Sequence, residues 1–124
     1  LISWGGSIGT AVAAHAAGRR APDGIVLEAG FPSARSLLSG NPVLYALSYL
    51  ATYRFATSEA MSGVTAPALV IHGDRDLFPL DGAKSVAESL SHARLAVLDD
   101  CGHFAFLERP VEVQAAVADF LRQW

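Results

Sequence analysis

One serine of this 124-residue chain lies in a glycine-rich pentapeptide that could support nucleophilic chemistry. The segment Gly5, Gly6, Ser7, Ile8 and Gly9 matches the pattern G-x-S-x-G. This pattern is typical of a sharp turn between a strand and a helix, which exposes the serine hydroxyl above the edge of a sheet. We expect glycine to be required at positions 5 and 9, because side chains there would collide with the neighbouring strand and helix. Ser7 is therefore the candidate nucleophile, and the N–H of Ile8 is a candidate oxyanion donor.

Two residues further along the chain have the types that would activate such a serine. A serine hydroxyl is a weak nucleophile at neutral pH, so it needs a general base, and the base needs an acid that orients it. Asp76 and His103 follow Ser7 in the order that accompanies this turn. Each lies in a polar loop just after an apolar run. Because the carboxyl ends of parallel strands meet at one edge of a sheet, we expect all three side chains to come together there.

Other side chains compete for these roles. Asp74 could replace Asp76 as the acid, although an aspartate in such a turn commonly bonds backbone N–H groups instead. Glu28 also ends an apolar run, and we expect it to be a satisfied carboxylate beside the site. Cys101 precedes His103 by two residues but lacks a comparable turn, so we expect a small buried side chain.

The remaining histidines are expected to be structural. His15 falls in the predicted helix after the serine and His92 falls in a polar stretch, so packing or surface roles are expected for them. His72 precedes Gly73 at the end of an apolar run, where it would satisfy a local hydrogen bond. His103 is thus the candidate base.

Alternating strand and helix patterns must position these side chains. Apolar runs typical of buried strands cover residues 1–4, 25–27, 68–71 and 95–98. Helical patterns cover residues 10–18 and 80–90 and the segment after Pro110. This alternation predicts the α/β class, with four parallel strands flanked by helices on both faces.

Residues 36–62 interrupt the alternation and form a predicted helical insert. Tyr45, Tyr49 and Tyr53 are spaced four apart, which would place them on one stripe of a helix. The insert could be a lid or cap over the site, or a helix that packs its aromatic side on the domain. The sequence leaves both possibilities open.

Several motifs together resemble the α/β-hydrolase fold family, in its serine hydrolase branch. Residues 5–9 resemble the nucleophile elbow of that family, and residues 70–76 resemble its acid loop, in which the second aspartate is the triad member. Residues 101–104 and 107–110 resemble its histidine loop and the lead into its last helix. Residues 27–33 resemble a segment that follows the sixth strand of the family.

The resemblance implies that residues 1–124 are the C-terminal half of such a domain, with a Ser7, His103, Asp76 triad. The first strands of the family, and the loop that supplies its second oxyanion donor, do not match any part of this sequence. Only Ile8 is then available to an oxyanion hole, which argues against full activity of this piece alone. The strand at residues 1–4 is expected to be an exposed edge.

The chemistry that these features predict is acyl transfer to water through an acyl-enzyme. The expected partner is a small molecule with an ester, thioester or amide bond and an apolar acyl part, and carboxylic-ester hydrolysis is favoured. The reaction would need no cofactor and no metal. Two alternatives stay open: a peptidase of the prolyl-oligopeptidase-like type, and a non-catalytic binding module on the same fold.

Composition narrows the function classes further. The chain is 52% hydrophobic and 17% charged, which indicates a packed core rather than disorder. Its net charge of -3 provides no basic face, so nucleic-acid binding is disfavoured. No apolar run approaches the roughly 18 residues of a membrane span. One cysteine excludes an internal disulfide and slightly favours a cytoplasmic location, but the compartment is not determined.

Overall fold

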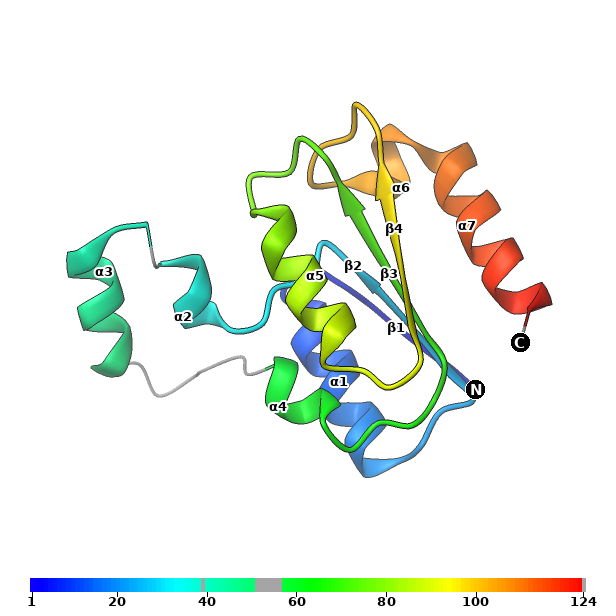
Figure 1. Ribbon diagram of the computed structural model, residues 1–124, viewed down its shortest axis with the longest axis horizontal. Coiled ribbons are helices and arrows are strands. Elements are labelled where there is room, and N and C mark those ends of the chain that lie inside the picture. The colour runs from blue at the N-terminus through cyan, green and yellow to red at the C-terminus, as the bar shows by residue number, and fades with distance from the viewer. Residues whose placement is uncertain (39, 51–56, 124) are drawn as a thin grey trace.

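Four strands form one parallel sheet in the order β1-β2-β3-β4 (Figure 1). The computed structural model describes residues 1–38, 40–50 and 57–123. The strands are β1 (Ile2–Gly6), β2 (Gly24–Glu28), β3 (Ala68–Gly73) and β4 (Ala93–Leu98). Each strand begins and ends within two residues of the corresponding apolar run. The predicted α/β class with parallel strands is therefore confirmed.

The register of the sheet aligns the carboxyl ends of the strands. Gly6 of β1 pairs with Glu28 of β2, which in turn pairs with Ile71 of β3. Gly73 of β3 pairs with Leu98 of β4. The loops that follow β1, β3 and β4 therefore leave the sheet at the same edge, and these loops carry the three candidate residues.

One face of the sheet is covered by α1 (Gly9–Arg19), α4 (Thr57–Met61) and α5 (Leu80–Glu88) (Figure 1). The alanine-rich α1 buries small side chains, and this lets its backbone approach the strands closely. Larger side chains of the strands and of the neighbouring helices fill the rest of this layer. The buried cluster includes Ala14, Ile25, Leu27, Met61, Val70 and Val86.

The opposite face is covered by α6 (Ala105–Glu108) and α7 (Pro110–Arg122) (Figure 1). Proline is suited to the first turn of α7, where an N–H would have no partner inside the helix. Val113 and Phe120 of α7 pack in a second buried cluster with Val26 and Ile71. Successive residues of the central strands thus alternate between two cores, which explains why their apolar runs are continuous.

The two outer strands are less protected than the central pair. Every residue of β2 and β3 is buried, whereas β1 and β4 contain several exposed or half-buried residues. In the part of the chain that the structure describes, β1 pairs only with β2. The expected edge position of the first strand is therefore confirmed.

The described residues of the insert form several short helices. They are α2 (Ala34–Leu37), α3 (Pro42–Leu47), the 3₁₀ turn η1 (Ser48–Leu50) and α4, which packs on the sheet. No residue of α3 or η1 is buried. Tyr45 and Tyr49 meet edge to face with ring centroids 5.7 Å apart, as their spacing predicts, while Tyr53 lies outside the described residues. The assignment of residues 36–62 as a lid stays a prediction.

Candidate active site

Ser7 occupies a strained turn between β1 and α1. Its φ of 52° lies in the left-handed region, which costs energy for a residue with a side chain. Two backbone contacts fix the turn: the Ser7 N–H donates to the Glu28 carbonyl at 2.8 Å, and the Thr10 N–H donates to the Ser7 carbonyl at 3.0 Å. The Thr10 hydroxyl also donates to that carbonyl. The sharp strand-to-helix turn predicted from the pentapeptide is present.

The glycines of this turn are not equivalent. A Cβ on Gly5 would lie 2.3 Å from the Gly9 carbonyl oxygen and 2.8 Å from the Ala13 Cβ. A Cβ on Gly9 would meet no described atom within 4 Å. The prediction that a side chain at Gly9 would collide is therefore wrong. The crowding lies between the Cα of Gly5 and the first turn of α1, so only Gly5 must lack a side chain for steric reasons.

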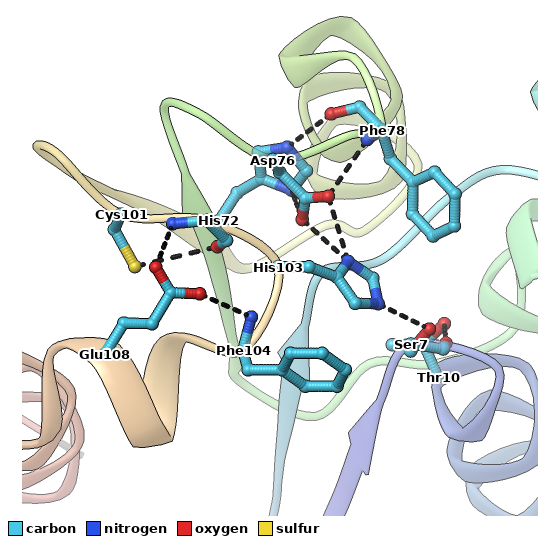
Figure 2. Close-up of polar contacts among 10 residues, drawn as sticks. Ser7, Thr10, His72, Asp76, Phe78, Cys101, His103, Phe104 and Glu108 are labelled. Atoms are coloured by element: carbon cyan, nitrogen blue, oxygen red, sulfur yellow. Dashed lines mark hydrogen bonds and ion pairs between the residues drawn. The ribbon is translucent and has the colours of Figure 1, made fainter.

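The structure brings Ser7, His103 and Asp76 into one hydrogen-bonded chain (Figure 2). Ser7 Oγ lies 2.9 Å from His103 Nε2. His103 Nδ1 lies 2.9 Å and 3.0 Å from the two carboxylate oxygens of Asp76. The Asp76 side chain has no exposed area, and that of His103 is 17% exposed. With the proton on Nδ1 donated to the carboxylate, Nε2 can accept the serine proton.

The acid loop after β3 assigns different partners to its two aspartates. Asp76 Oδ1 also accepts the Phe78 N–H at 2.9 Å. Asp74 Oδ1 accepts the Cys101 N–H at 3.1 Å, so it connects the acid loop to the histidine loop. Hydrogen bonds from the backbone N–H groups of Cys101 and Asp100 hold the pKa of Asp74 below its ordinary value. Asp74 therefore has the backbone-bonding role expected for the competing aspartate.

The histidine loop after β4 is fixed by a carboxylate that sequence reasoning did not assign a role. Glu108, the last residue of α6, accepts the Gly102 N–H at 2.8 Å and the Phe104 N–H at 3.2 Å. Gly102 and Phe104 directly precede and follow His103 in the chain. Figure 2 shows the bond of Glu108 to the Phe104 N–H. The only signal in the sequence was the position of Glu108 inside the segment 107–110 that resembles the family motif.

Parts of the chain are similar in sequence to known hydrolases. No protein-family model matches the chain. The chain is 33% identical over 69 residues to monoacylglycerol lipase ABHD6 of Mus musculus, covering 55% of this chain and 20% of that relative. It is 42% identical over 64 residues to pimeloyl-[acyl-carrier protein] methyl ester esterase of Aromatoleum aromaticum, covering 51% of this chain and 26% of that relative. These matches span only a fifth to about a quarter of the relatives' length.

Solved structures extend the similarity over nearly the whole chain. VinJ matches with a TM-score of 0.82 and 14% identity, over 98% of this chain and 65% of its own. MGS-MChE2 is an α/β hydrolase enzyme from the metagenome of lagoon sediments at Mar Chica, Morocco. It matches with a TM-score of 0.78 and 21% identity, over 99% of this chain and 61% of its own. The chain has the α/β-hydrolase fold.

Only one of the two carboxylate oxygens of Glu28 has a hydrogen-bond partner among the described residues. Its Oε1 accepts the Trp4 Nε1–H at 2.6 Å, but the buried Oε2 has no hydrogen-bond partner among the described residues. Burial raises the pKa of the Glu28 carboxyl, and the bond from Trp4 opposes that shift. The expectation of a satisfied carboxylate is therefore wrong for one oxygen, because the interior at the end of β2 provides a single donor.

Two aromatic rings contact the His103 imidazole. Phe78 and Phe104 both meet the imidazole edge to face, with centroids 4.8 Å and 5.1 Å away. Cys101 is fully buried, and burial raises the pKa of its thiol. This agrees with the small buried side chain expected for Cys101 and disfavours a thiolate nucleophile.

The other three histidines of the chain have the positions that the sequence predicts. His15 and His92 are exposed. His72 is buried, and its Nε2 lies 3.0 Å from the Phe78 carbonyl oxygen, which is the local hydrogen bond expected for it. None of the three contacts Ser7 in the described part of the chain.

Within residues 1–38, 40–50 and 57–123, no three His, Cys, Asp or Glu side chains are grouped so that they could hold a metal ion. Over the same residues, no helix has the length and the apolar composition that a bilayer span requires.

Proposed function

We propose that this chain carries the catalytic residues of a serine hydrolase that cleaves a carboxylic ester, thioester or amide through an acyl-enzyme. The observation that carries the proposal is the continuous hydrogen-bonded chain from Ser7 Oγ through His103 to Asp76. The strained conformation of Ser7 supports the same conclusion, because strain of this kind is common at reactive residues.

In the first half of the reaction, His103 Nε2 takes the Ser7 proton as Oγ attacks the carbonyl carbon of the substrate. Asp76 stabilises the imidazolium that forms. The tetrahedral intermediate then collapses, and the leaving alcohol, thiol or amine takes the proton from His103. In the second half, His103 deprotonates a water that attacks the acyl-enzyme, and the same proton returns to Ser7 as the acid is released.

The Ile8 N–H is the proposed oxyanion donor in this chain. Ile8 directly precedes α1 and donates no backbone hydrogen bond in the described residues. The positive end of the helix dipole lies at the same position, so a developing negative charge would be stabilised there. A second donor is not assigned to any residue of this sequence.

The proposed substrate has an apolar acyl part. Ser36, Asp81 and Ser85 line one part of a cavity of about 300 Å³. Its apolar part is formed by Phe31, Pro32 and Pro79 together with Phe78, which contacts the base. Rings of this kind favour hydrocarbon over charged groups. The relatives named above are a monoacylglycerol lipase and a methyl ester esterase, which supports an ester substrate. Residues 36–62 are the proposed lid, whose exposed Leu44 and Leu47 would contact such a substrate.

A fluorophosphonate probe tests the proposal directly, because it phosphonylates only an activated serine. We expect the full chain to form one adduct at Ser7 and the variant S7A to form none. S91A is the matched control, because Ser91 is exposed in the loop before β4 and lies outside both the hydrogen-bonded chain and the cavity. In a full-length active protein, S7A should lower kcat for ester hydrolysis by on the order of 10⁵ to 10⁶.

The outcome also separates the alternatives. A folded protein that forms no adduct at Ser7 would contradict the hydrolase and favour a binding module. Faster cleavage of a peptide anilide than of a matched ester would favour the peptidase. A single adduct at Ser7 with preference for the ester supports the proposal.

A further inference from the structure

His72 is a buried imidazole next to the acid loop that the proposed acyl transfer does not use. It is the penultimate residue of β3, and its side chain has no exposed area. Its Nε2 lies 3.0 Å from the Phe78 carbonyl oxygen (Figure 2). Because a carbonyl oxygen can only accept, Nε2 carries the proton of this bond and donates it.

His72 does not bond the acid directly. Its Nδ1 lies 3.9 Å from Asp76 Oδ2, which is beyond hydrogen-bond distance. That nitrogen has no hydrogen-bond partner among the described residues. The hydrogen bond of the His72 side chain to the acid loop is therefore the one to the Phe78 carbonyl.

Phe78 contacts both the proposed acid, Asp76, and the proposed base, His103. Its N–H donates to Asp76 Oδ1 at 2.9 Å, and its ring meets the His103 ring at 4.8 Å between centroids. The N–H and the carbonyl of Phe78 belong to the two peptide planes on either side of its Cα. Hydrogen bonds at both planes fix the backbone of Phe78, and the following Pro79 restricts it further. The direction of the Cα–Cβ bond that carries the ring is fixed as a result.

We propose that His72 is a positioning residue that acts through Phe78 on the acid and the base. The inference rests on the proposed function of Ser7, His103 and Asp76. The His72 Nε2–H holds the Phe78 carbonyl, so that the Phe78 N–H meets Asp76 while the Phe78 ring meets His103. Misplacing reacting groups by about 1 Å can cost on the order of 100-fold in rate. Since His72 touches no substrate, its loss should lower kcat and leave KM unchanged.

Two amide variants separate the two ring nitrogens of His72. Glutamine can place an N–H near the position of Nε2, whereas asparagine can place one only near that of Nδ1. In the full chain, H72Q should keep the acylation rate with a fluorophosphonate within about 3-fold of the parent, and H72N should lose roughly 10- to 100-fold. H15N is the control for losing an exposed histidine elsewhere.

A spectroscopic measurement reports the geometry without requiring activity. The proton shared between His103 Nδ1 and Asp76 gives a far-downfield proton NMR signal when the two groups are held together. We expect the parent, H15N and H72Q to keep this signal and H72N to lose or broaden it. Ester turnover then assigns the H72N effect to kcat rather than KM.

Each outcome decides the proposal. Parent-like rates and signal in H72N overturn it, and so do equal losses in H72Q and H72N, which would make His72 a filler of volume. If H72N does not fold by circular dichroism, H72Q decides alone, because loss of the signal in folded H72Q overturns the proposal. A parent that shows the signal but forms no Ser7 adduct contradicts the hydrolase function, while the signals of the variants still test His72.

Discussion

At the scale of single residues, three carboxylates around His103 have different roles because they meet different partners. Asp76 accepts from the imidazole, whereas Asp74 and Glu108 accept backbone N–H groups of the loop that carries the imidazole. A hydrogen bond from a backbone N–H to a carboxylate is stronger than a neutral one. The loop is thus held in position before any substrate binds, which is what general base catalysis requires.

Glu28 provides a prediction about pH and stability. Burial raises the pKa of its carboxyl, so the folded state binds the proton more tightly than the unfolded state does. The contribution of Glu28 to stability is therefore most favourable below the ordinary glutamate value of 4.5, and it is lost as the pH rises through the raised value. E28Q should be more stable than the parent at neutral pH, because glutamine keeps an acceptor for Trp4 and cannot ionise.

Urea denaturation at a series of pH values measures this effect. The advantage of E28Q should disappear below the ordinary glutamate value, where the parent carboxyl is neutral in both states. E59Q is the control, because Glu59 is exposed. A stability difference between E28Q and the parent that does not change with pH would contradict the prediction.

At the scale of elements, the elbow depends on how closely β1 approaches α1. The predicted pair of required glycines reduces to Gly5 alone, because a Cβ there would overlap the backbone of Gly9. The helix also begins at Gly9 without a side-chain cap. The N–H groups of Thr10 and Ala11 donate to the carbonyls of Ser7 and Ile8, so the Ile8 N–H just before the helix is the one left to stabilise an anion.

The two glycines therefore predict opposite effects on folding stability. G5A should cost roughly 1–3 kcal/mol or more, because the methyl group would be forced into an occupied space. G9A should be neutral or gain up to about 1 kcal/mol, because alanine is the better helix former. Chemical denaturation monitored by circular dichroism compares the two variants. Equal losses in the two variants would contradict the assignment of the crowding to Gly5.

At the scale of the whole molecule, parallel topology brings together residues that are 96 positions apart in sequence, Ser7 and His103. The strands all run in one direction, so every loop at their carboxyl ends lies at one edge. The same architecture leaves β1 with one neighbour. Beside β1, an apolar groove of about 550 Å³ runs along α7 and is lined by Trp4, Phe106, Val117 and Leu121.

This edge predicts self-association of the 124-residue chain. Unpaired strand edges and apolar patches both favour contacts between copies. Light scattering should show an apparent mass that rises with concentration. L121K, in the groove, should weaken the association, whereas V12K, on the exposed side of α1, should not. A chain that stays monomeric at high concentration would refute the expectation.

The sequence by itself determined the α/β class, the order of the elements and the candidates for nucleophile, acid and base. These follow from local features: continuous apolar runs for strands buried on both faces, and a turn whose glycines are readable within five residues. The local hydrogen bond of His72 and the burial of Cys101 were also predictable, because His72 ends an apolar run and Cys101 is a small side chain without a turn like that of Ser7.

Only the tertiary structure decided which partner each polar atom meets. The roles of Asp74 and Glu108, the unpaired oxygen of Glu28 and the tolerance at Gly9 depend on distances between segments that no local pattern encodes. The same is true of the insert, whose tyrosine spacing predicts one helix where the structure has α3 and η1. Hydrogen bonds and steric contacts act over a few ångströms, so they are fixed only once the sheet has brought the loops together.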